Sequence, residues 1–238
     1  MDGFSYINIF DTKGIEYIVI IIFLLLLIPF WVILNKKKEI ATEIRKSYGL
    51  LSAKLKSSPH GLYFSKNHTW AFMERSGLAT VGLNNLLLHI TGKVKINYLK
   101  YPGEIVSKGD LIAELQQESR RLKIFSPISG KIFETNDLTG EKPHIVHEDP
   151  YEKGWLFAIK PTAWQQDIRD FYLAEEANNW LTMEMERIRD FVSVKNAQHE
   201  PEYAYVRLQD GGELVHGLMS ELPAELWHDF QQEFLNMK

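Results

Sequence analysis

The most apolar stretch of the chain runs from Tyr17 to Leu34, eighteen residues without a charge. As a helix that rises about 1.5 Å per residue, this stretch nearly crosses a hydrocarbon core of about 30 Å. Tyr17 and Trp31 lie near its two ends, as aromatic side chains do at membrane interfaces. We therefore predict one transmembrane helix within residues 15–35.

The charges on the two sides of this stretch differ in sign. Three acidic residues and one lysine precede it, whereas Lys36, Lys37 and Lys38 follow it directly. The positive-inside rule then places residues 1–14 outside the cytoplasmic (inner) membrane and the main domain in the cytoplasm. Residues 36–58 are typical of a basic juxtamembrane stalk, and we expect its three lysines to contact membrane lipids. A cleaved signal peptide needs the opposite order of charge.

The pattern changes in residues 59–161 to short runs of Val, Ile, Phe and Tyr between Gly, Pro, Asn and Asp. Such runs are typical of strands joined by tight turns. We predict a mainly β fold, a small sandwich or flattened barrel. The predicted strands are Trp70–Glu74, Leu78–Val81, Val94–Leu99, Asp110–Gln116, Arg121–Phe125, Gly130–Phe133 and Gly154–Ile159.

Residues 162–238 show helical spacing, then a glycine-rich turn, then helical spacing again. They predict a long helix followed by a small ββα extension. Because this extension is too small to bury its apolar face alone, we expect it to pack on the β domain, on a second copy or on a partner. The expected elements are a helix from Thr162 to Val194, a hairpin of Tyr203–Leu208 and Glu213–Leu218, and a final helix from Pro223 to Leu235.

Composition and the absence of known motifs argue against several kinds of function. The formal net charge of -4 lacks the basic excess of nucleic-acid-binding domains, so we expect no nucleic acid. The chain has no cysteine, which excludes disulfides and thiol chemistry. It contains no phosphate-binding, dinucleotide-binding or nucleophile-elbow motif. His144 and His147 have no third ligand fixed by spacing, so we predict no metal site and no catalytic residue.

Five short motifs follow one another in the predicted β region. Their order and spacing, over about a hundred positions, resemble the glycine cleavage system H protein family. The resemblance implies a lipoyl-type β sandwich, also called a barrel-sandwich hybrid. The motifs are His68-Thr69-Trp70, Ala79-Thr80-Val81-Gly82-Leu83, Val106-Ser107-Lys108-Gly109-Asp110, Ser126-Pro127-Ile128-Ser129-Gly130, and Glu148-Asp149-Pro150-Tyr151 with Gly154-Trp155-Leu156.

The resemblance also points to a position for the family's carrier lysine, which holds the lipoyl group at the tip of a β-hairpin. Counting eight residues back from Pro127 reaches Ser119. A serine hydroxyl cannot form the amide linkage, and the guanidinium of Arg120 stays protonated and non-nucleophilic. We therefore expect a degenerate member of the family, without a cofactor. Lys123 becomes an acceptor only if the hairpin register shifts.

These observations predict a non-enzymatic, membrane-anchored scaffold or accessory subunit that docks other subunits of a membrane complex, and they are compatible with a homo-oligomer. Arg120, Arg121 and Lys123 are the candidate docking residues, although solvated charge on an exposed turn is the simpler explanation for them. One alternative is a lipoyl carrier that uses Lys123 beside a membrane redox enzyme. Another is a membrane-fusion-type export adaptor, for which Asp110–Pro127 is too short to hold the usual helical hairpin.

Overall fold

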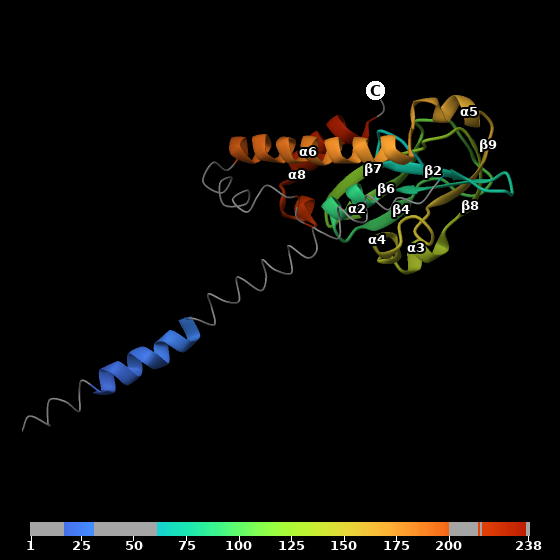
Figure 1. Ribbon diagram of the computed structural model, residues 1–238. Coiled ribbons are helices and arrows are strands. Elements are labelled where there is room, and N and C mark those ends of the chain that lie inside the picture. Colours follow the sequence, from blue (N-terminus) through green and yellow to red (C-terminus); the bar gives the residue numbers. More distant parts are fainter. Residues whose placement is uncertain (1–16, 31–60, 200–213, 215, 237–238) are drawn as a thin grey trace, which may run out of the picture. The chain divides into compact units, whose positions relative to one another are not determined.

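The computed structural model describes residues 17–30, 61–199, 214 and 216–236 (Figure 1). The chain divides into two units, Met1–Leu50 and Leu51–Lys238. In the first unit, residues 17–30 form a helix with exposed side chains. Among the described residues, no helix has both the length and the apolarity that a membrane crossing requires. The predicted N-terminal segment 1–14 and stalk 36–58 lie outside the described residues.

The described part of the second unit contains two antiparallel sheets. The larger has the strand order β10-β1-β2-β3-β9-β8-β5 and the smaller the order β4-β6-β7. All seven strands predicted from the sequence have a counterpart, whereas the two-residue strands β1, β5 and β10 were not predicted. The strands are β1 (Tyr63–Phe64), β2 (Thr69–Met73), β3 (Ala79–Leu83), β4 (Lys95–Tyr98), β5 (Ile105–Val106), β6 (Leu111–Gln117), β7 (Arg120–Phe125), β8 (Gly130–Thr135), β9 (Phe157–Pro161) and β10 (Tyr172–Leu173).

The centre of the larger sheet explains two of the sequence motifs. Trp70 on β2 is fully buried, and its indole Nε1 donates a hydrogen bond to the carbonyl of Leu83 at 3.0 Å. The same ring lies against Gly82 on β3, where an added Cβ would come within 2.5 Å of it. The tryptophan of the first motif therefore requires the glycine of the second.

One helix inside the β region was not predicted. This helix, α2 (Asn85–Thr91), follows directly after β3, and the side chain of Asn84 caps it by accepting a hydrogen bond from the Leu87 amide at 2.9 Å. All of its residues are buried. A short helix that is buried on every side lacks a clear amphipathic period, so its run of Leu and Ile resembles that of a buried strand.

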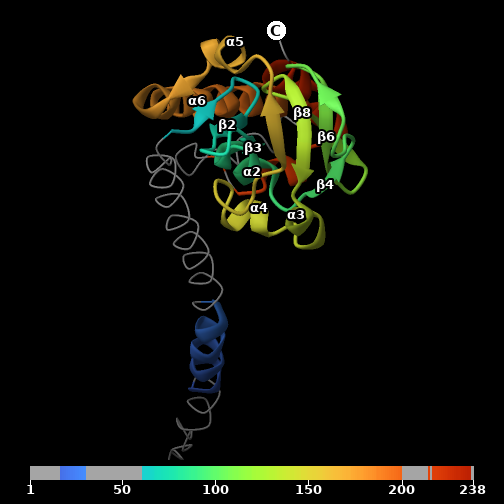
Figure 2. The ribbon, with the colours of Figure 1, turned by 90° about the vertical axis from the view of Figure 1, so that its right-hand side faces the viewer.

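Of two further short helices, α4 (Ile145–Glu148) contacts α2, and α3 (Asp137–Glu141) contacts α4 and β4. Both were missed as well. Figures 1 and 2 show them on the side of the sheets opposite to the long helix α6 (Ala174–His199).

The predicted helix from Thr162 to Val194 is wrong at its start. Residues 164–173 instead form α5 (Trp164–Asp167), a 3-10 turn η1 (Ile168–Asp170) and β10, which pairs with β1. The apolar spacing continues across this segment, but Ala174 has a φ of 50°. This left-handed conformation cannot continue a right-handed helix, and it separates the short elements from α6.

The C-terminal residues confirm the final helix, as α8 (Ala224–Phe230) continued by a π-helical turn η3 (Gln231–Leu235). The second predicted hairpin strand is wrong where it is described, because residues 216–217 form a turn and η2 (Leu218–Glu221) follows. A bend at Gly217, with a φ of 72°, ends any extended run. The first predicted strand lies outside the described residues.

The C-terminal elements pack on the β domain of the same chain. The elements α8 and η3 contact β7, and η2 contacts α2. On its other side, α8 meets α6, where Phe191 touches the rings of Phe230 and Phe234 and Lys195 pairs with Asp229 at 2.7 Å. The apolar face of this extension is therefore buried within the chain.

Candidate functional site

The tip of the β6–β7 hairpin is a two-residue turn. Gln117 pairs with Arg120, which leaves Glu118 and Ser119 as the connecting residues, and both are exposed. Glu118 has a φ of 54°, as tight hairpin turns demand. Ser119 therefore lies at the apex, and this turn holds no helical insertion. A lipoyl group, which needs a lysine amine, does not fit these two side chains.

Arg120 does not project from the tip as a free charge. Its guanidinium Nη1 donates a hydrogen bond of 2.6 Å to the carbonyl of Ser220, and it lies 5.9 Å from the ring centre of Trp227. The indole of Trp227 in turn donates to the carbonyl of Met219 at 2.7 Å. Arg120 thus fastens the C-terminal elements to the hairpin, a role that the sequence did not reveal.

Arg121 and Lys123 point away from the core, because Leu122 and Ile124 between them are buried. Arg121 lies 3.4 Å from the carboxylate of Glu114 on β6, and its side chain is 59% exposed. The side chain of Lys123 is exposed and has no hydrogen-bond or ion-pair partner among the described residues. The returning strand, not the apex, carries this lysine, as the sequence predicted.

The main chain of Lys123 is held by a buried side chain of η3. The Lys123 amide donates to Gln231 Oε1 at 2.6 Å, and Gln231 Nε2 donates to the Lys123 carbonyl at 3.3 Å. Because β7 is an edge strand of its sheet, these peptide groups face outward. Gln231 replaces part of a missing neighbouring strand.

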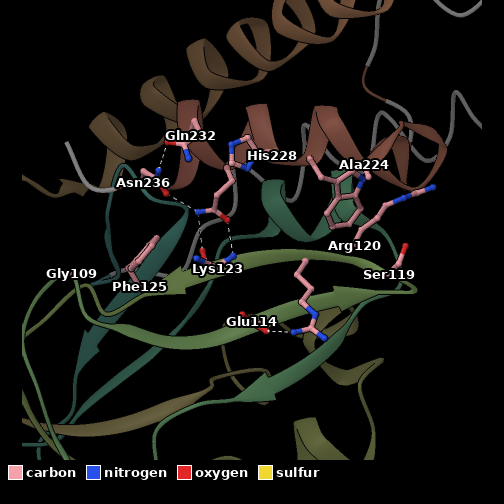
Figure 3. A pocket seen from close by; sticks show the side chains of 13 residues that line it. Gly109, Glu114, Ser119, Arg120, Lys123, Phe125, Ala224, His228, Gln232 and Asn236 are labelled. Atoms are coloured by element: carbon pink, nitrogen blue, oxygen red, sulfur yellow. Dashed lines mark hydrogen bonds and ion pairs between the residues drawn. The ribbon is translucent and has the colours of Figure 1, made fainter. Parts of the chain in front are cut away.

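A groove of about 630 Å³ lies between the hairpin and the C-terminal helix. Figure 3 shows Ser119 at one end, Phe125 and Gly109 at the other, and Lys123 between them beneath the helix. Its strand wall includes Arg121, Lys123 and Phe125. Its helix wall presents a stripe at four-residue spacing, Ala224, His228, Gln232 and Asn236. This stripe was not predicted from the sequence, because its position across from β7 depends on tertiary packing.

Comparison with known proteins assigns the fold. Residues 62–184, just over half of the chain, match the glycine cleavage H-protein family. The chain belongs to this family. The match extends past Pro161, where the sequence-based boundary was placed, and ends inside α6.

Individual H proteins match about half of the chain. The probable glycine cleavage system H protein of Thermococcus kodakarensis is 30% identical over 121 residues, which are 51% of this chain and 90% of the relative. The glycine cleavage system H protein of Paraburkholderia xenovorans is 34% identical over 107 residues, 45% of this chain and 84% of that protein. A crystal structure of the H protein from Mycobacterium marinum aligns with 24% identity and a TM-score of 0.45, covering 52% of this chain and 99% of that one.

Within this H-protein domain, His68 of the first motif is a buried structural residue. Its Nδ1 lies 3.1 Å from the side-chain nitrogen of Asn84, and its Nε2 lies 3.4 Å from the carboxylate of Glu184 on α6. Burial alone would raise the pKa of Glu184, but His68 and Arg187 offset this effect and hold that pKa below its ordinary value. The motif histidine therefore helps to attach α6 to the β domain.

Three histidines far apart in the sequence gather where η2 meets α2. The rings of His89 and His216 are 5.1 Å apart, and His89 Nε2 lies 3.2 Å from the carbonyl of Leu214. Burial, together with the nearby imidazoles, lowers the pKa of His89 and of His147 from 6.5 to about 4. Among the described residues, no group of three or more His, Asp or Glu side chains has a geometry that holds a metal ion.

Proposed function

We propose that this protein is a non-enzymatic H-protein-like subunit that docks partner proteins of a membrane complex and carries no lipoyl group. The observation that supports this proposal is the composition of the hairpin apex, Glu118 and Ser119. Neither side chain supplies the amine that an amide-linked lipoyl group needs. The family fold remains, with a serine at the position that the resemblance assigns to the carrier lysine.

The neighbouring arginines do not restore the missing chemistry. Arg120 and Arg121 stay protonated near neutral pH, so neither acts as the nucleophile of an acyl transfer. Arg120 is also occupied by the carbonyl of Ser220. What the hairpin retains is a shaped, charged surface beside the C-terminal helix, and this surface suits recognition of another protein.

The membrane part of the proposal rests on the sequence. The uncharged stretch from Tyr17 to Leu34 and the lysines at 36, 37 and 38 suit a single-pass anchor with its N-terminus outside and the H-protein domain in the cytoplasm. A reporter fused after Lys238 tests the orientation, since a cytoplasmic signal is expected and an external signal would place the domain on the other side.

The absence of the lipoyl group is tested by coexpressing the full chain with a lipoate ligase and measuring its intact mass. We expect no added lipoyl mass on the wild-type chain. The Ser119→Lys variant is the matched positive control, because it restores an amine at the apex of the same turn, and we expect it to gain one lipoyl group. Lipoylation of the wild-type chain would refute the proposal.

A second candidate is a lipoyl carrier that uses Lys123, and its exposed amine, which has no partner in the described part of the chain, favours this candidate. Against this candidate stands the location of Lys123 on a strand whose main chain is fixed by Gln231. The Lys123→Ala variant separates the two: if the wild-type chain carries a lipoyl group and the variant does not, Lys123 is the acceptor.

A further inference from the structure

The groove between β7 and the C-terminal helix has the repeat of an extended peptide. Arg121, Lys123 and Phe125 project from the same face of β7, because alternate residues of a strand share a face. Successive side chains in this row are therefore roughly 6.5 to 7 Å apart. An extended ligand has the same repeat, so its alternate side chains can meet these three residues in turn.

The groove carries a net positive charge along β7. Arg121 and Lys123 contribute two exposed cations, and the half-buried Arg120 also lines the groove, next to Ser119. Among the described lining residues, Glu114 is the one carboxylate, and it lies beside Arg121 at 3.4 Å. Lys123 has no partner charge among the described residues, so a ligand carboxylate meets an ammonium group that is not already neutralised.

The main chain of the strand is not available in the same way. Gln231 occupies both the amide and the carbonyl of Lys123, at 2.6 and 3.3 Å. A ligand that added to β7 as a new strand would have to displace this buried glutamine. Recognition in this groove therefore depends on side chains. The side-chain amides of Gln232 and Asn236 on the opposite wall offer further polar contacts.

We propose that this groove binds an extended acidic segment of a partner protein, with carboxylates at alternate positions and an apolar residue two positions beyond them. The two carboxylates would meet Arg121 and Lys123, and the apolar residue would meet Phe125. This inference rests on the proposed docking function and names the chemistry of the partner. A compact anion such as phosphate suits the site less well, because it needs donors that converge on one point.

The test uses the full chain in detergent micelles and measures fluorescence anisotropy of a labelled pentapeptide. The peptide carries Glu at positions one and three and Phe at position five. We expect saturable binding that weakens as salt is added, because the contacts are exposed charge pairs. A peptide of the same composition with adjacent glutamates should bind several-fold more weakly, since only one carboxylate then matches the spacing.

Two sets of variants locate the binding. The Arg121→Glu/Lys123→Glu pair should weaken binding about tenfold or more, by analogy with like-charge contacts at interfaces. The matched control is Lys131→Glu/Lys160→Glu, a pair of exposed lysines opposite each other on β8 and β9, and it should bind as the wild type does. Glu114→Gln should strengthen binding, a gain that a misfolded protein would not produce.

Each remaining outcome counts against the proposal. Equal loss in both lysine-containing pairs would indicate a general charge effect, and no binding at millimolar peptide would exclude the acidic segment. Competition by inorganic phosphate at the affinity of the peptide would assign the groove to a phosphate group instead. None of these three results bears on whether the chain carries a lipoyl group, so the intact mass still tests the proposed function separately.

Discussion

The attachment of the C-terminal helix to β7 gives a sharp prediction for Gln231. This side chain is 7% exposed and makes three hydrogen bonds, two to the Lys123 peptide groups and one to Asn236 at 3.0 Å. Gln231→Ala removes all three and leaves two outward main-chain groups of an edge strand without a protein partner. Unsatisfied polar groups of this kind should lower the free energy of unfolding by about 1 to 3 kcal/mol.

Hydrogen exchange of the Lys123 amide measures this loss of stability at a single site. Because about 1.4 kcal/mol corresponds to a tenfold change in an equilibrium constant, the Lys123 amide should exchange about tenfold faster or more in Gln231→Ala. The control is Gln232→Ala, an exposed neighbour whose side chain accepts a hydrogen bond from Asn236 at 2.7 Å and, among the described residues, makes no other. Unchanged protection of the Lys123 amide in Gln231→Ala, or equal loss in the control, would refute this account of the attachment.

Three further predictions concern stability. Burial lowers the pKa of His89 and His147 from 6.5 to about 4, so between these two pH values the unfolded chain binds more protons than the folded chain. The free energy of unfolding, measured with urea, should therefore fall by a few kcal/mol as the pH drops from 7 to 4.5. A free energy of unfolding that does not change over this range would contradict the prediction. Gly82→Ala should lower the urea midpoint strongly, because its Cβ would meet Trp70 at 2.5 Å, and an unchanged midpoint would dispute that packing. Arg120→Ala should increase proteolysis of the C-terminal residues without unfolding the sheets, and intact C-terminal protection would show that its bonds to η2 are dispensable.

The strands were predictable because their side chains alternate. On β7 the sequence Arg121, Leu122, Lys123, Ile124 already separates an exposed face from a buried one, and the structure has the same pattern. The position of Ser119 at the hairpin apex followed instead from the resemblance to the H-protein family, through the count of eight residues back from Pro127. The alternation on β7 is a matter of local spacing, which the folded chain preserves.

Some features were not predicted from the sequence, either because they depend on contacts between residues far apart in the chain or because their residues show no helical periodicity. The helix α2 is buried on every side, so its apolar residues carry no helical pattern. The predicted helix start at Thr162 failed because β1 recruits β10 as a neighbour. The groove needed Gln231 and Lys123, more than a hundred positions apart in the chain, to be adjacent.

The central claim, that this H-protein domain works without a lipoyl arm, is tested most directly by the mass of the chain purified from its native source. We predict the mass of the unmodified polypeptide, with tandem mass spectrometry showing a free hydroxyl at Ser119 and a free amine at Lys123. A covalently attached lipoyl or octanoyl group on any residue of the hairpin would contradict the claim and would show that the protein is a lipoyl carrier.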